Sequence, residues 1–203
     1  MTTIIGVQGD GFSIICADSR ISSMDDGGFA SQITTLGRNS SKVAVNGRYL
    51  LGAAGDVRAI NILHHVFQPP IPPPGITGSK LDQFFTSKFI PSLRATFEVQ
   101  GYAAPERDES SHIAEQGSTV ICSINGSIYV VDGDYSWTSD VSGLYALGTG
   151  ASYALGAMSI LFPKKGIPNI PQAKTLCLKA IAVSAKFDPH TGPPYYCYVQ
   201  EET

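Results

Sequence analysis

Residue patterns typical of strands and of helices occupy separate blocks of this 203-residue chain. Strand patterns lie at 2–8, 12–18, 42–45 and 48–54, and a helical region follows over residues 56–99. A second strand region covers 118–148, a second helical region covers 151–187, and a last strand pattern lies at 193–199. A parallel sheet would need strands and helices that alternate. The segregation therefore predicts an α+β fold with two sheets stacked face to face and a pair of helices outside each.

Turn signals divide the strand regions into hairpins. Asp-Gly lies between the predicted strands 2–8 and 12–18, and Asn46-Gly47 lies inside the second pair of strand patterns. Asn125-Gly126, between two β-rich runs, is the clearest signal, because both residues tolerate the left-handed conformation of a tight hairpin turn. The residues after Asp18 are polar and Gly-rich, which is typical of a loop.

Prolines and caps delimit the helical regions. Asp56 is the expected N-cap of a first helix, which the sequence QPPIPPPG must end because proline cannot continue it. Pro91 predicts a kink or a break in a second helix over 80–99. We expect the proline-rich segment and the polar loop 103–117 on the surface. No repeat or linker interrupts the pattern, so residues 1–203 are expected to form a single domain.

Composition excludes several classes of function. The net charge is −3 and the pI is about 5.7, which argues against a nucleic-acid-binding protein. The chain has no apolar run of the roughly 20 residues that a membrane span needs. The four cysteines share no CxxC spacing, so neither a metal site nor a redox pair is expected, and no cofactor is implied. We interpret the cysteines as buried, reduced thiols and expect a cytoplasmic protein.

The first residues contain one candidate for chemistry. If Met1 is removed, Thr2 carries a hydroxyl nucleophile and a free amine on the same residue. An α-amine has a reference pKa of about 7.7–8.0, so it can accept the hydroxyl proton near neutral pH. No propeptide before Thr2 is expected, and removal of methionine would then be the only maturation step. A catalytic terminus must be held still, which would explain a strand that begins at the start of the chain.

Five short motifs, in order, resemble the proteasome β-subunit family of N-terminal-nucleophile hydrolases, which includes the peptidase subunit of a bacterial ATP-dependent protease. They are TTIIGV, ADSR, GAAGD, LGTGASYALGAM and FDPHTG, and they extend from residue 2 to residue 192. The resemblance implies the four-layer αββα sandwich of that family. It also implies a threonine-type endopeptidase that forms an acyl-enzyme and acts on peptides or unfolded proteins.

The resemblance also assigns roles to individual residues. Thr2 corresponds to the nucleophile, and Asp18 corresponds to the acid that holds a lysine. Lys42 is the best candidate for that lysine, although its spacing to Gly52 is shorter than the family's, and Arg38 is the rival. The backbone N–H of Gly52 corresponds to the oxyanion donor. The polar group that positions the terminal amine corresponds to Thr149, Asp188 and Thr191, with threonine at 149 where serine is usual.

Two alternatives keep the fold and change the function. The chain could be a non-catalytic shell subunit, because each site residue alone also fits an ordinary role at a strand end or turn. It could also be a hydrolase of small amides from the wider N-terminal-nucleophile group. The family resemblance implies a homo-oligomeric ring and allows an ATPase partner, with no membrane or nucleic-acid partner.

Overall fold

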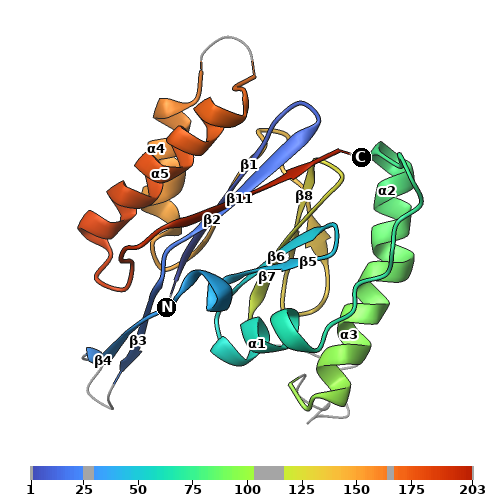
Figure 1. Ribbon diagram of the computed structural model, residues 1–203, viewed down its shortest axis with the longest axis horizontal. Helices are drawn as coiled ribbons and strands as arrows, with labels where there is room; N and C mark the ends of the chain where they lie inside the picture. Colours follow the sequence, from blue (N-terminus) through green and yellow to red (C-terminus); the bar gives the residue numbers. More distant parts are fainter. Residues whose placement is uncertain (1, 25–29, 103–116, 164–166, 203) are drawn as a thin grey trace.

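A computed structural model describes residues 2–24, 30–102, 117–163 and 167–202. Its first half contains β1 (Thr3–Gln8), β2 (Phe12–Ala17), β3 (Arg20–Met24), β4 (Ala30–Thr35), β5 (Val43–Asn46), β6 (Tyr49–Ala54), α1 (Val57–His65), α2 (Gly78–Phe84) and α3 (Ile90–Val99). Its second half contains β7 (Thr119–Ile124), β8 (Ser127–Val131), β9 (Trp137–Thr138), β10 (Leu144–Gly148), α4 (Ala151–Leu161), α5 (Ile170–Phe187) and β11 (Tyr196–Glu201). Figure 1 shows their arrangement.

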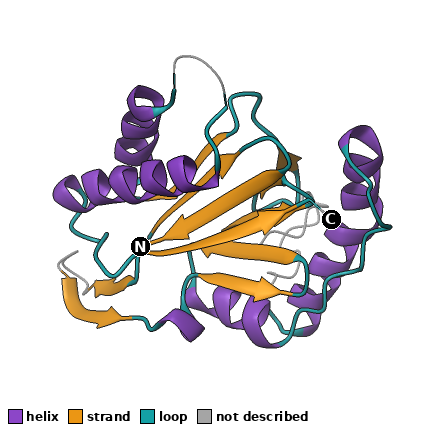
Figure 2. Ribbon diagram, turned by 45° about the horizontal axis from the view of Figure 1, so that its top comes forward, coloured by secondary structure: helices purple, strands orange, loops and turns teal. Residues whose placement is uncertain are grey.

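The strands form two main antiparallel sheets. One has the order β10-β1-β2-β11 and the other has the order β5-β6-β7-β8-β9. Helices α4 and α5 cover the first sheet, and α1, α2 and α3 lie on the far side of the second (Figures 1 and 2). The layers are therefore helix, sheet, sheet, helix, which confirms the predicted four-layer α+β sandwich.

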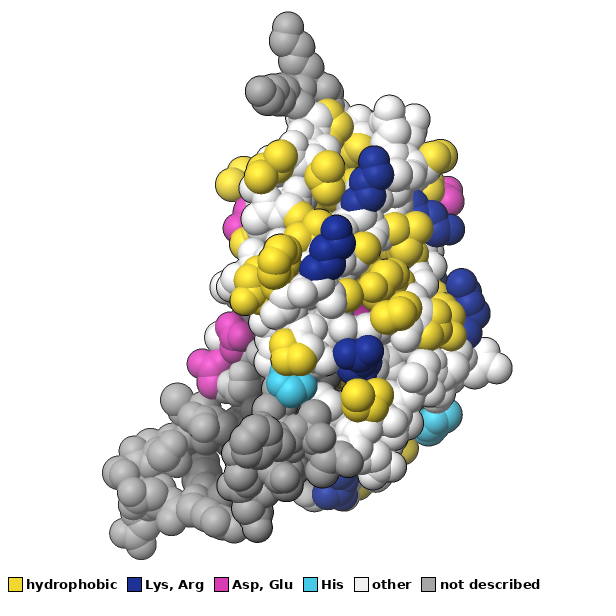
Figure 3. Space-filling view, turned by 90° about the vertical axis from the view of Figure 1, so that its left-hand side faces the viewer, with side chains coloured by type: hydrophobic (Ala, Val, Ile, Leu, Met, Phe, Trp, Pro, Cys, Tyr) yellow, Lys and Arg dark blue, Asp and Glu magenta, His cyan; other side chains and the backbone are white. Residues whose placement is uncertain are grey.

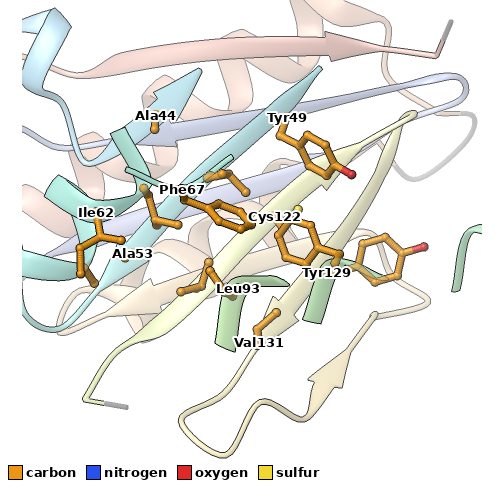
Figure 4. Packing of buried hydrophobic residues seen from close by; sticks show 14 of the residues in the cluster. Ala44, Tyr49, Ala53, Ile62, Phe67, Leu93, Cys122, Tyr129 and Val131 are labelled. Atoms are coloured by element: carbon orange, nitrogen blue, oxygen red, sulfur yellow. The ribbon is translucent and has the colours of Figure 1, made fainter. Parts of the chain in front are cut away.

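Three layers of apolar side chains hold the sandwich together, because alternate residues of a strand point to opposite faces. Along β1, Ile4 packs between the two sheets, whereas Ile5 packs under α4 and α5. The third layer lies between the second sheet and α1–α3, where the rings of Phe85 and Tyr129 stack with centroids 4.1 Å apart. Figure 4 shows the part of this layer around Phe67 and Tyr129.

The hairpins expected from the turn signals are present. Strand β1 pairs with β2, β5 with β6, and β7 with β8. Asn125 and Gly126 have φ angles of 48° and 76°, as a tight turn of this type requires.

The helix boundaries follow the caps and prolines. The Asp56 carboxylate accepts a hydrogen bond from the Arg58 N–H and caps α1. The expected helix over 80–99 is interrupted before Pro91 by a π-helical turn, Phe85–Phe89, which separates α2 from α3. Most of the proline-rich segment 68–75 is exposed, as predicted. The expected loop 103–117 falls almost entirely outside the described residues.

Two expectations from the sequence are wrong. The first is the loop expected after Asp18. This region contains the β3–β4 hairpin, because pairing between the two strands stabilises an extended backbone that its residues do not favour by themselves.

The second concerns the cysteines. Cys16 and Cys197 face each other in register on β2 and β11 and form a disulfide, so they are not reduced thiols. Cys122 and Cys177 are buried and free, as expected. The cytoplasmic location therefore loses the support of the cysteine argument and stays a prediction. Within the described ranges, every helix is too short or too polar to cross a membrane.

Candidate active site

The start of β1 lies at the centre of the candidate site. Thr2 is only 4% exposed, and Thr3 is fully buried. By the alternation along the strand, Thr3 shares the face of Ile5, under the helices, and Thr2 shares the face of Ile4, between the sheets. Two polar clusters lie beside these threonines, one around Asp18 and one around Asp188.

The first cluster is built on Asp18, which follows the last residue of β2. One carboxylate oxygen, Oδ1, accepts hydrogen bonds from the Lys42 ammonium at 2.6 Å and from the Thr3 N–H at 2.9 Å. The other oxygen, Oδ2, accepts from the N–H groups of Arg20 at 3.0 Å and Gly192 at 3.1 Å. Asp18 thus fixes the position of a cation and of the first strand at the same time.

Lys42 precedes β5, and its side chain is 0% exposed, as is that of Asp18. Burial lowers the pKa of the Lys42 ammonium below its ordinary value, and the attraction of Asp18 opposes this effect only in part. The predicted ion pair between Asp18 and Lys42 is therefore confirmed. Arg38 is not in that place: it begins a short 3₁₀ turn, Arg38–Ser40, and its guanidinium lies over the rings of Tyr196 and Tyr198.

The second cluster is built on Asp188, which ends α5. Its Oδ2 accepts hydrogen bonds from the hydroxyls of Thr191 at 2.6 Å and Thr149 at 2.7 Å, and its Oδ1 accepts from the His190 N–H at 3.1 Å. Burial opposes the charge on Asp188, but the donors from Thr191, Thr149 and His190 outweigh it, so the pKa of this carboxyl lies below its ordinary value. Thr149, Asp188 and Thr191 are thus in contact, as the resemblance implies.

The loop after α5 joins the two clusters. Gly192 donates its N–H to Asp18, and the Thr191 hydroxyl lies 2.5 Å from the Thr3 hydroxyl. The Arg20 guanidinium donates to the carbonyl of Pro189 at 2.7 Å. All these contacts connect β1, the β2–β3 junction and the loop 188–192 into one polar unit.

Gly52 lies on β6 opposite Val43, the residue after Lys42. A Cβ atom here would lie 2.9 Å from Ile121 Cγ2, 3.3 Å from Ile4 Cδ1 and 3.4 Å from the Lys42 carbonyl oxygen. The packing between the sheets therefore requires glycine at this position. This reason is independent of the oxyanion role that the resemblance implies.

Several residues of this unit were not among the sequence candidates: Thr3, Arg20, Gly150 and Gly192. The doubled threonine of TTIIGV is the signal that could have found Thr3, since a strand places consecutive side chains on opposite faces. The two glycines act through their size, because each is packed against a site side chain. In the part of the chain that the structure describes, no cluster of three or more His, Cys, Asp or Glu side chains could hold a metal ion.

Comparison with known proteins gives matches at the level of structure. No family model matches the sequence, and no curated protein matches it. The structure of BPH from Thiobacillus denitrificans in complex with epoxomicin superposes with a TM-score of 0.72 at 19% identity, over 99% of both chains. A second BPH structure gives a TM-score of 0.70 at 20% identity, over 99% of this chain and 98% of the other. HslV from Trypanosoma brucei gives 0.61 at 16% identity, over 98% of this chain and 99% of that one.

Proposed function

We propose that this protein, which has the fold of the proteasome β-like N-terminal-nucleophile hydrolases, is a threonine peptidase. In this proposal Met1 is removed, Thr2 becomes the nucleophile, and peptide bonds are hydrolysed through an acyl-enzyme. The observation that carries it is the fully buried ion pair between Lys42 and Asp18, with Asp18 also holding the Thr3 N–H.

A buried ion pair is weak as a device for stability, because desolvation of two charges offsets most of their attraction. Lysine is also among the residues least often fully buried. An ammonium in this place has a chemical use, since it would lower the proton affinity of a nearby hydroxyl and amine by electrostatic repulsion. This argument favours a catalytic protein over a shell subunit, for which the pair would have no such use.

The proposed reaction uses the chain's own groups. The α-amine of Thr2 accepts the hydroxyl proton, and Oγ1 forms a bond to the carbonyl carbon of the scissile peptide. The negative charge that develops on the carbonyl oxygen is stabilised by the Gly52 N–H. The C–N bond then breaks, and the leaving amine takes the proton from the α-amine. Water hydrolyses the ester and restores the Thr2 hydroxyl. Asp188, with Thr149 and Thr191, would hold the α-amine in place.

The test is covalent labelling with epoxomicin, the molecule bound in one of the solved BPH structures. We expect the protein that has lost Met1 to form an adduct on Thr2, and Thr2→Ala to form none while keeping its fold, since only two heavy atoms at the chain end are removed. Thr2→Ser retains the oxygen and the amine and should label more slowly. Intact mass, followed by peptide mapping, measures all three.

Two results would contradict the proposal. One is labelling of Thr2→Ala as fast as wild type, because Thr2 would then not be the nucleophile. The other is processed wild type that takes up no epoxomicin and cleaves neither peptides nor small amides, which would favour the shell subunit. Cleavage of small amides alone would favour the small-amide hydrolase.

We also propose that the chain forms a homo-oligomer. The face formed by α4 and α5 carries apolar side chains interspersed with lysines (Figure 3). Exposed on these two helices are Tyr153, Leu155, Ile160, Leu161, Leu178 and Phe187. Large apolar side chains exposed together on one face are typical of contact sites between proteins. Light scattering of the same preparation measures the particle mass, and a monomer at micromolar concentration would contradict the proposal.

A further inference from the structure

We infer that the hydroxyl of Thr3 is a positioning group for the neighbouring Thr2, because it ties the first strand to the Asp188 cluster. This inference rests on the proposed function. It concerns a residue to which neither the sequence motifs nor the reaction proposed above assigns a role.

The hydrogen bonds around Thr3 have a defined direction. The carboxylate of Asp188 can only accept, so the Thr191 hydroxyl donates its proton to Oδ2 at 2.6 Å. The Thr191 oxygen is then the acceptor in its 2.5 Å contact with Thr3, and the Thr3 hydroxyl is the donor. The result is a chain of two hydroxyl donors that ends on a buried carboxylate. Such chains strengthen each member, because each donor polarises the next.

The backbone of Thr3 is held from the other side. Its N–H donates to the Asp18 carboxylate at 2.9 Å, and its carbonyl accepts from the Asp18 N–H at 3.1 Å. Thr3 is therefore the residue of β1 that touches both carboxylate clusters, Asp18 with its main chain and Asp188 through its hydroxyl. A single peptide bond separates it from Thr2. Its position consequently sets where the Thr2 amine and hydroxyl can lie.

The space around the Thr3 hydroxyl is shaped for it. A Cβ atom on Gly150 would lie 2.1 Å from Thr3 Oγ1, 2.9 Å from Thr191 Oγ1 and 3.0 Å from Asp188 Oδ2. Gly150 has a φ of −87°, which any residue can adopt, so its backbone does not require glycine. The requirement for glycine comes from these three oxygens. Gly150 therefore offers a second way to disturb the same contact without changing Thr3.

Thr3→Val is the main test, because valine keeps the shape of threonine and replaces the hydroxyl by a methyl group. We measure the rate of covalent modification by epoxomicin as a function of inhibitor concentration, which separates the maximal rate from the half-saturating concentration. We expect Thr3→Val to lower the maximal rate about tenfold, the change that one hydrogen bond of ordinary strength is worth. The half-saturating concentration should stay close to that of wild type, since the Thr3 side chain lies on the opposite face of β1 from that of Thr2.

Three further variants make the test specific. Thr3→Ser keeps the donor and should restore most of the maximal rate, which a merely packing role of the side chain would not explain. Gly150→Ala should lower the maximal rate at least as much, because its methyl group displaces the Thr3 hydroxyl and also crowds Thr191 Oγ1 and Asp188 Oδ2. Thr175→Val, on the exposed part of α5, is the matched control and should behave like wild type.

The outcomes separate this inference from the proposed function. Wild type that forms no adduct on Thr2 would overturn the proposed function. Wild type that labels normally, with Thr3→Val equally fast, would overturn only the role of Thr3. If Thr3→Val does not fold, Gly150→Ala and Thr3→Ser decide: an unchanged maximal rate in Gly150→Ala, or a loss in Thr3→Ser as large as in Gly150→Ala, overturns the inference.

Discussion

The two carboxylates of the site have the same chemistry but different surroundings. Asp18 accepts hydrogen bonds from a buried ammonium and from the backbone N–H groups of Thr3, Arg20 and Gly192. Asp188 accepts from the hydroxyls of Thr149 and Thr191 and from one backbone N–H. The charge of Asp18 is thus balanced by a cation in direct contact. The hydrogen-bond donors to Asp188 are neutral hydroxyl and N–H groups, and Lys42 and His190 act on its charge electrostatically.

This difference indicates different tasks. A carboxylate paired with a buried lysine acts mainly on that lysine, by keeping it charged and in one orientation. A carboxylate held by hydroxyl groups keeps its negative charge for a further cationic partner. In the proposed reaction that partner is the α-amine of Thr2, and the cluster would orient it. The comparison can be tested by removing one member of each cluster at a time.

The largest effect on stability is expected for Asp18→Asn. The substitution leaves the Lys42 ammonium buried without its counter-charge, and breaking a buried pair in this way costs about 3–5 kcal/mol. Asp188→Asn leaves the Asp18–Lys42 ion pair in place and should cost about 1–3 kcal/mol, the value of hydrogen bonds to a charged group. Urea denaturation at neutral pH measures both variants. Equal losses in the two variants would contradict the distinction between the clusters.

Lys42→Met should destabilise the fold less than Asp18→Asn does, although it removes the same ion pair. Asp18 keeps its three backbone donors, so its charge stays solvated, and methionine fills much of the space of the lysine stem. We expect a loss of about 1–3 kcal/mol in the free energy of unfolding, together with a complete loss of labelling by epoxomicin. A Lys42→Met variant that labels at the wild-type rate would exclude the ammonium from the chemistry.

Much of the fold follows from local signals in the sequence. The Asn-Gly and Asp-Gly turns, the Asp56 cap and Pro91 act on their immediate neighbours, so they can be recognised without knowledge of distant contacts. The β3–β4 hairpin could not be predicted in this way, because its polar residues carry no period-2 pattern and its stability depends on pairing between strands. The Cys16–Cys197 disulfide depends on the register of two strands separated by 181 residues in sequence.

The residues of the site also divide into those that a local motif identifies and those that depend on distant contacts. Asp18, Asp188 and Thr191 lie in short motifs whose residue types are distinctive, so the family resemblance could identify them. Lys42 lies outside any motif, so the sequence makes it the best candidate but leaves Arg38 as a rival. The contact of 2.6 Å between Lys42 Nζ and Asp18 Oδ1 decides between them. Thr3 was part of a motif but had no assigned chemistry, because its role depends on Thr191, which is 188 residues away. The roles of Lys42 and Thr3 depend on contacts between distant segments, and the spacing of residues along the chain does not predict such contacts.

The smallest effect concerns the pH dependence of the Asp188 cluster. Burial opposes the charge of Asp188, but the donors from Thr191, Thr149 and His190, together with the electrostatic effect of His190, hold the pKa of this carboxyl below its ordinary value. The unfolded chain should titrate near the reference value of about 3.9. A carboxyl whose pKa is lower in the folded state stabilises it above the unfolded pKa and loses that contribution as the pH falls through the folded pKa. Asparagine does not titrate. The deficit of Asp188→Asn relative to wild type should therefore stay constant from pH 7 to about pH 5 and shrink at lower pH. Denaturation midpoints of both proteins across this pH range measure the stability deficit of the variant.

Thr149→Val removes only one of the donors to Asp188. Its stability deficit relative to wild type should also shrink at low pH, but by a smaller amount. A deficit that is unchanged down to pH 3 would mean that the hydroxyl groups of Thr149 and Thr191 do not stabilise the charged form of Asp188, and the contrast between the two carboxylates would then rest on the Asp18 ion pair alone.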